Sequence, residues 1–142
     1  MRKIGLTILV ALLFWGNSSF DTFRPSAQTY SKEQIENFIR EVYVGFSDEL
    51  FFKPNASRLK LTTDFLQRVH VVRDAQYRST KLPLLSSFPL VTDYNPNLKR
   101  ETIFNPSTFN PLKYNFDMFS KSRTIVKVDQ TDYAIIIDAR NY

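Results

Sequence analysis

The sequence predicts an α+β domain in which N-terminal helices pack on a C-terminal antiparallel β-meander. In the first half of the chain, apolar residues recur at three- and four-residue intervals, which is the period of an amphipathic helix. Near the end of the chain they alternate or form short β-branched runs, as strands do. Aromatic residues make up 15% of the 142 residues, which is enough apolar surface for one packed core.

The chain starts with a segment typical of a secretory signal peptide. Two cations, Arg2 and Lys3, precede an uncharged and mainly apolar run over residues 4–15. Small polar residues then end this run. It is shorter than the roughly 20 residues that a membrane-spanning helix needs. The order of cations, apolar run and small polar residues therefore predicts export.

These signals divide the chain into three parts. We expect residues 1–18 to be a signal peptide, with cleavage as late as residue 27. Residues 19–30 are expected to be a linker, and residues 31–142 a single α+β domain. The protein would then be exported, to the periplasm or outside the cell, with no stable membrane span after cleavage. An uncleaved anchor and a buried N-terminal helix are the alternatives.

The first helix has the clearest local signals in the chain. Ser31 and Gln34 have the spacing of a capping box, and Tyr30 and Ile35 that of a hydrophobic staple. We expect the helix to end within residues 45–48. An aromatic-rich stripe at helical spacing forms its buried face: Ile35, Phe38, Ile39, Val42, Tyr43 and Phe46.

A second helical region is expected after residue 55, in one or two pieces. Leu59 and Leu61 would belong to a short first turn, and a segment from Asp64 onward, capped by Thr62 or Thr63, would fade within residues 74–77. Four apolar residues would form its buried face: Phe65, Leu66, Val69 and Val72. Residues 79–111 contain five prolines, so no long regular element fits there. We expect this stretch to be an ordered loop packed on the domain.

Three strands are predicted near the C-terminus, over residues 112–118, 124–128 and 133–137. The first alternates apolar and polar residues, and the last is apolar on both faces. Short turns between them favour an antiparallel meander, with the most apolar strand at its centre. This order of elements resembles that of small cone-shaped pocket folds similar to nuclear transport factor 2. The resemblance implies a sheet curled around the first helix.

Composition and charge exclude several classes of protein. The chain has 19 Lys and Arg against 14 Asp and Glu, and removal of residues 1–27 leaves 16 against 13. Such a small surplus is an ordinary solvated surface, so we expect no nucleic-acid partner. The absence of cysteine excludes disulfides, thiolate metal sites and a lipid-modified cysteine. Three glycines are too few for a phosphate-binding loop, and we expect no cofactor.

The residues that could carry catalysis are few. His70 is the only histidine, so a histidine metal cluster is excluded and we expect no metal site. We place His70 on the second helix, in a packing or surface role. A serine–histidine–acid triad would need it beside Asp138 or another carboxylate, and the chain has no nucleophile-elbow motif. We expect no enzymatic activity; a hydrolase that uses His70, or the region of Asp117 and Asp138, is the alternative.

The aromatic residues are the candidates for ligand contact. Aromatic residues at helical or strand spacing usually form the core, whereas those in the proline-rich segment follow no period and could form a binding surface. The candidate residues are Tyr43, Tyr94, Phe104, Phe109, Tyr114 and Phe116. We expect an exported domain that binds a protein or an envelope component. The alternative is a small-ligand pocket lined by Tyr43, Tyr114 and Phe116.

Overall fold

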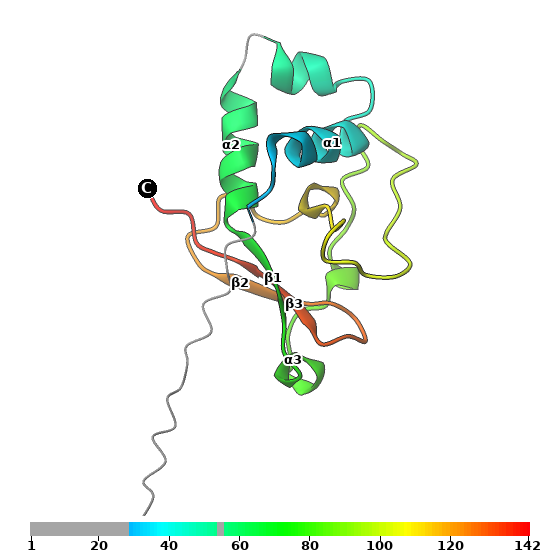
Figure 1. The fold of residues 1–142 in the computed structure, drawn as a ribbon, viewed down its shortest axis with the longest axis vertical. Helices are drawn as coiled ribbons and strands as arrows, with labels where there is room; N and C mark the ends of the chain where they lie inside the picture. The colour runs from blue at the N-terminus through cyan, green and yellow to red at the C-terminus, as the bar shows by residue number, and fades with distance from the viewer. Residues whose placement is uncertain (1–28, 54–55) are drawn as a thin grey trace, which may run out of the picture.

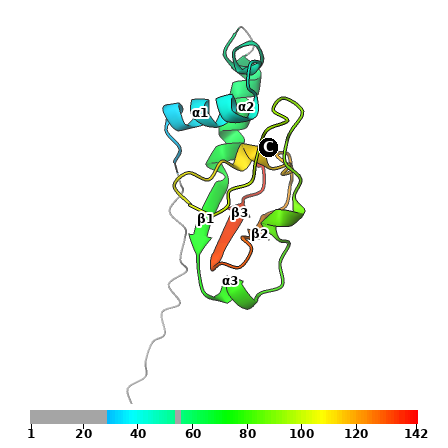
Figure 2. The same ribbon diagram turned by 90° about the vertical axis from the view of Figure 1, so that its right-hand side faces the viewer.

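The computed structural model describes residues 29–53 and 56–142, so the predicted signal peptide and its cleavage sites lie outside the described residues. Figure 1 shows α1 and α2 at one end of the molecule and α3 at the other, with the sheet between them; Figure 2 shows the same order. The α+β class is confirmed. The elements are α1 (Lys32–Val42), a π-helical turn (Asp48–Phe52), α2 (Ala56–Gln67), β1 (Val69–Arg73), α3 (Gln76–Ser79), two 3₁₀ turns (Leu85–Ser87 and Pro111–Lys113), β2 (Thr124–Lys127) and β3 (Tyr133–Ile137).

Helix α1 begins as its sequence predicts. The Ser31 hydroxyl accepts a hydrogen bond from the Gln34 backbone N–H at 3.1 Å, and the Gln34 side chain accepts one from the Ser31 N–H at 2.9 Å. The helix ends at Val42, earlier than predicted, because the chain turns at Gly45, whose φ of +79° is left-handed. Phe46 therefore leaves the buried stripe, and 48% of its surface is exposed.

The second helical region is one continuous helix from Ala56 to Gln67, with no new start at Asp64, and it ends earlier than predicted. Thr62 lies inside α2, where it is buried, and does not cap it. The predicted continuation to residues 74–77 is wrong, because β1 occupies Val69–Arg73. Three of these five residues are valine, which favours strands, and their backbone groups pair with residues 133–137 of β3. His70 accordingly lies on a strand.

The sheet has the strand order β1-β3-β2, and both pairings are antiparallel. The strands predicted over residues 124–128 and 133–137 are confirmed, and β3 is central, as expected from its apolar character. Figure 2 shows the three strands side by side. Within the described residues the sheet has three strands and is not closed, so it does not form the cone that the resemblance implied.

The strand predicted over residues 112–118 does not form. Asn110 instead caps a 3₁₀ turn, in which its side-chain oxygen accepts a hydrogen bond from the Leu112 N–H at 3.0 Å. Pro111 occupies the start of that turn, where its fixed φ is compatible and its missing N–H costs nothing. Tyr114 makes only an isolated antiparallel bridge, to Leu90. The other edge of the sheet is formed by β1, which pairs with β3 although residues 74–132 lie between them. Such a pairing is possible because the entropic cost of loop closure grows slowly with loop length.

The two faces of the sheet pack in different ways. Val69, Val126 and Ile135 face the main core, which also contains the buried face of α1. The alternating residues Val72 and Ile136 face the other side, where they form a smaller cluster with Ala134. Tyr77 of α3 packs on this second cluster.

Candidate functional site

A cleft of about 540 Å³ lies between the loop around residues 100–104 and the turn that joins β2 to β3. It is open to solvent, and both polar and apolar side chains line it. The lining residues come from four separate stretches of the chain, so no local motif marks them. They are Leu85, Ser86, Arg100, Glu101, Thr102, Ile103, Phe104, Tyr114, Val128, Asp129, Gln130 and Thr131.

Glu101 holds one wall of the cleft to the body of the domain. Its two carboxylate oxygens accept hydrogen bonds from Lys113 Nζ at 2.9 Å and from the Tyr114 hydroxyl at 2.7 Å. Lys113 is buried and also lies 3.3 Å from the carboxylate of Glu41 on α1. Burial, and then the hydrogen bond to Glu101, raise the pKa of Tyr114 well above its usual value. The hydroxyl therefore stays protonated and donates to Glu101.

Arg100 fixes the same wall from its other side. Its guanidinium donates to the backbone carbonyls of Leu85 and Phe88, and it lies over the Tyr114 ring at 5.5 Å from the centroid. A stacked guanidinium with two carbonyl acceptors is well ordered. The wall is thus rigid where Arg100 and Glu101 meet the domain.

The opposite wall is the turn between β2 and β3. Asp129 accepts hydrogen bonds from the Ser86 N–H at 3.0 Å and the Ser86 hydroxyl at 2.5 Å. Burial alone would raise the pKa of Asp129, but the hydrogen bonds from Ser86 outweigh burial and hold the pKa below its usual value. Gln130 has a φ of +56°, which gives this turn its sharp reversal.

The outer part of the loop carries groups without partners. Among the described residues, nothing forms a hydrogen bond with the backbone of residues 99–104. The Ile103 side chain is 83% exposed, the largest exposed fraction of any large apolar side chain that the structure describes. The cleft therefore offers free backbone donors and acceptors beside an exposed aliphatic group. The sequence did not predict Arg100, Glu101, Ile103 or Asp129 as site residues. No local motif marks them, because their partners Ser86, Lys113 and Tyr114 lie in other stretches of the chain.

Four of the six predicted aromatic residues form one continuous row. Phe104 contacts Phe109 at 5.2 Å between ring centroids, Phe109 contacts Tyr114 at 5.6 Å, and Tyr114 contacts Phe116 at 5.7 Å. Phe109, Tyr114 and Phe116 are buried, and Phe104 is half-buried. Only Phe104 and Tyr114 line the cleft. Most of the row is therefore part of the core that packs behind the cleft, and only Phe104 and Tyr114 could contact a ligand in it.

The other two predicted residues lie elsewhere. Tyr43 and Tyr94 contact each other at 5.0 Å, and Tyr94 also contacts the exposed ring of Phe46 at 5.5 Å. Neither tyrosine lines the cleft. The pocket predicted from Tyr43, Tyr114 and Phe116 is therefore not the cleft that the structure contains.

His70 does reach a carboxylate. Its Nε2 lies 2.8 Å from Asp138 Oδ2, and the Nε of Arg123 donates to Asp138 Oδ1 at 2.9 Å. However, His70 is buried beside Val72 and Ile136 and does not line the cleft. The other candidate acid, Asp117, accepts a hydrogen bond from the Phe119 N–H in a local turn. His70, Asp117 and Asp138 are therefore not among the residues that line the cleft.

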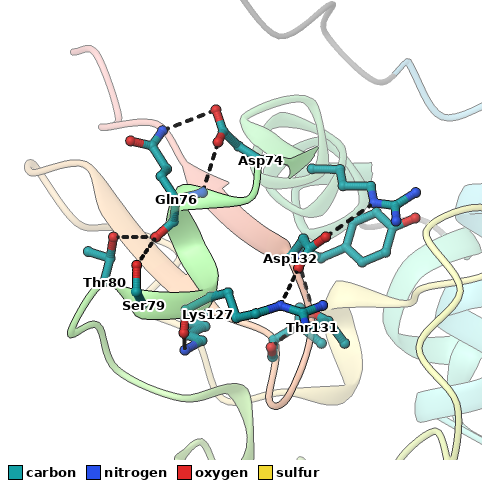
Figure 3. Close-up of polar contacts among 11 residues, drawn as sticks. Asp74, Gln76, Ser79, Thr80, Lys127, Thr131 and Asp132 are labelled. Atoms are coloured by element: carbon teal, nitrogen blue, oxygen red, sulfur yellow. Dashed lines mark hydrogen bonds and ion pairs between the residues drawn. The ribbon is translucent and has the colours of Figure 1, made fainter.

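A polar network fixes the end of the sheet near the cleft. Figure 3 shows Asp132 at its centre; its carboxylate oxygens lie 2.7 Å from Arg78 Nε and 3.8 Å from Arg73 Nε. Lys127 donates to the Arg78 carbonyl, and the Asp74 N–H donates to the Asp132 carbonyl at 3.0 Å. These contacts join α3 to the β2–β3 turn and so hold the second wall of the cleft.

Neither metal chemistry nor a membrane span is indicated for the part of the chain that the structure describes. No three His, Asp or Glu side chains gather there in a way that could hold a metal ion. No helix of that part is long and apolar enough to cross a membrane. We compared the chain with known protein families, curated proteins and solved structures, and none of them matches it.

Proposed function

We propose that this protein is an exported, non-enzymatic domain whose cleft binds an extended segment of a partner protein. The observation that carries the proposal is the loop at residues 99–104. Its backbone makes no hydrogen bond with another described residue, and Ile103 stands exposed at its tip. Extended peptides that bind through main-chain hydrogen bonds need free backbone donors and acceptors, and side-chain pockets then give them specificity. This loop is not a sheet edge, but it offers such free backbone groups beside a cleft.

The polar groups inside the cleft also support a binding role. Glu101 is already satisfied by Lys113 and Tyr114, and Asp129 by Ser86. A catalytic acid or base must come within hydrogen-bond reach of the proton that it transfers. Both oxygens of Glu101 and both of Asp129 already face a donor of the domain. These carboxylates therefore hold the walls of the cleft in place. The groups left to contact a partner are the backbone of the loop and the apolar side chains that line the cleft, such as Leu85 and Val128.

Site-specific photocross-linking tests this function. A photoreactive residue placed at Ile103 should give a cross-linked adduct with one protein of the envelope or the exterior, and mass spectrometry should locate the attachment within a single extended segment. The matched control is a photoreactive residue at Leu61, an exposed apolar position on α2. An adduct that forms equally at both positions, or attachment only to small molecules, would argue against the proposal.

A substitution adds an independent measurement. Ile103→Asp places a charge at the tip of the loop, where the side chain is too exposed for the change to disturb folding. In this variant a photoreactive residue is placed at Gln130, a second position of the cleft. We expect the adduct with the partner to be lost at this position, while the melting temperature of the variant stays that of the wild-type chain. Leu61→Asp is the control and should leave capture at Gln130 intact.

A further inference from the structure

Two cations at the C-terminal end of the described chain share one aromatic ring. Arg140 lies 5.0 Å from the centroid of the Tyr142 ring, and Lys121 Nζ lies 5.1 Å from the same centroid. Arg140 also lies 5.3 Å from the Phe119 ring, so its guanidinium contacts two aromatic faces. We call Phe119, Lys121, Arg140 and Tyr142 the C-terminal cluster.

The cations of this cluster have no anionic partner. Among the described residues, neither Lys121 nor the Arg140 guanidinium forms an ion pair or a side-chain hydrogen bond. Two like charges held near one ring repel each other, and cation–π contacts at exposed sites return only about 0.5–1 kcal/mol each. Neither cation is therefore neutralised by a paired carboxylate among the described residues.

Nearby carboxylates do not supply an anion to the cluster. Asp138 is engaged with Arg123 at 2.8 Å and with His70 at 2.8 Å. Asp117 accepts a hydrogen bond from the Phe119 N–H on the approach to the cluster. The donors of Arg140 and Lys121 thus remain available to a group from outside.

The cluster is built on a fixed base. Arg68 donates to the Asp138 carbonyl at 2.9 Å and to the Met118 carbonyl at 2.7 Å, which holds the two segments together. The Arg140 N–H donates to the Ser120 carbonyl at 2.9 Å and extends the same connection. These hydrogen bonds hold the backbone segments that carry Lys121 and Arg140 next to each other.

The rings of the cluster indicate what kind of anion fits. Phe119 is 53% exposed and Tyr142 is 81% exposed, so apolar area lies directly beside the free cations. A soluble anion would need the cations alone, whereas a lipid surface offers phosphates to cations and the headgroup region to aromatic rings. We infer that the C-terminal cluster is a peripheral docking site for an anionic lipid surface, in which Arg140 and Lys121 contact headgroup phosphates.

Vesicle sedimentation tests this inference. We use vesicles of phosphatidylcholine with or without phosphatidylglycerol, and every variant is prepared in the same form as the wild-type chain, so that residues 1–28 contribute equally. The wild-type chain should bind the anionic vesicles more strongly. Because each cation near such a surface contributes about 1 kcal/mol, Arg140→Gln and Lys121→Gln should each weaken binding about fivefold. Lys81→Gln, at an exposed position in the loop after α3, is the matched control and should change nothing.

Two further variants separate charge from ring contact. Asp117→Asn keeps the acceptor for the Phe119 N–H but removes a negative charge, so it should strengthen vesicle binding. Phe119→Ala keeps all charges and should weaken it. Equal binding of wild-type chain and the Arg140→Gln/Lys121→Gln double variant would overturn the inference.

The source of the phosphate is also tested. Inorganic phosphate and chloride are added at matched ionic strength, which screens exposed charges equally. If phosphate releases the protein where chloride does not, the cluster is a site for the free anion and the lipid inference is wrong. Ile103→Asp should leave vesicle binding intact, so that failure of the cleft proposal and failure of this one are distinguishable.

Discussion

At the scale of single residues, two buried polar groups of the core differ in whether they have a hydrogen-bond or ion-pair partner. Tyr30 precedes α1 and packs edge-on against Phe38 at 5.3 Å between ring centroids. Its hydroxyl is buried and forms no hydrogen bond with any residue that the structure describes. Lys113, by contrast, is a buried cation with two carboxylate partners. The first group is unsatisfied and the second is satisfied, so their removal should have opposite effects.

Tyr30→Phe should leave the free energy of unfolding at neutral pH unchanged or raise it, because it removes an unsatisfied buried hydroxyl. Burial raises the pKa of Tyr30 to about 12 from 10.0. Above pH 10 the unfolded chain loses this proton before the folded chain does, so stability falls up to about pH 12. Denaturant unfolding across this pH range should show a shallower loss for Tyr30→Phe. An unchanged alkaline slope would contradict this assignment.

Lys113→Met should destabilise the protein by about 3 kcal/mol, because it leaves the carboxylate of Glu101, whose side chain is only 18% exposed, without its cation. The double variant Lys113→Met/Glu101→Gln should recover most of that loss. Denaturant titration of the two single variants and the double variant measures the coupling energy. Additive effects would show that the two groups do not interact in solution.

At the scale of elements, both local sequence signals and pairing with distant strands determine which secondary structure a segment adopts. The capping box of Ser31 and Gln34 was predicted because both partners lie three residues apart. The strand β1 was missed because Val69 and Val72 continue the helical spacing of the residues before them, and its partner β3 lies sixty or more residues away. Alternation over residues 112–118 predicted a strand, but Pro111 and the Asn110 cap favoured a 3₁₀ turn. Sequence alone therefore predicted the elements with local partners.

Ser31→Ala should cost about 1 kcal/mol of stability, because the Gln34 N–H loses its acceptor at the start of α1. Thermal unfolding measures this loss. Ser31→Asp keeps an acceptor and is the control, and it should restore the wild-type melting temperature. Equal destabilisation by both substitutions would mean that the capping contact contributes nothing.

The contact between β1 and the residue that follows β3 should appear as acid sensitivity. Burial alone would raise the pKa of Asp138, but hydrogen bonds from Arg123 and His70 hold it below its usual 3.8. The folded state therefore keeps Asp138 ionised at pH values where the unfolded chain is protonated. The resulting stability is complete above about pH 4 and is lost as pH falls through the lowered pKa. Asp138→Asn should flatten the acid limb of stability against pH, measured by denaturant unfolding; an unchanged limb would contradict the account.

At the scale of the whole molecule, the cleft could not be predicted, because its walls come from stretches of chain that only the fold brings together. Of the six predicted aromatic residues, Phe104 and Tyr114 line it, and Phe109 and Phe116 support the row beneath. Tyr43 and Tyr94 belong to a separate group beside α1. The aromatic residues of the sequence predicted the core. The walls of the cleft could not be predicted, because Glu101 and Asp129 are held by hydrogen bonds to residues from other stretches of the chain.

Export is a property of the whole chain and has its own test. The full-length chain should yield a mature form that begins between residues 19 and 28, recovered outside the cytosol. Mass spectrometry of the N-terminus in separated cell fractions measures it. Replacing one apolar residue in the run over residues 4–15 with arginine should keep the uncut chain inside, because a charge breaks the apolar run that a signal peptide requires. Recovery of the intact chain from the cytosol without this change would contradict the prediction.

Hydrogen exchange tests the central claim most directly. In the free domain, the backbone amides of residues 99–104 have no acceptor among the described residues, so they should exchange without protection. When the partner segment that is cross-linked at Ile103 is bound, these amides should become protected, while those of α2 stay as they were. Protection that appears elsewhere and leaves residues 99–104 unprotected in the complex would contradict the claim that this loop receives the partner chain.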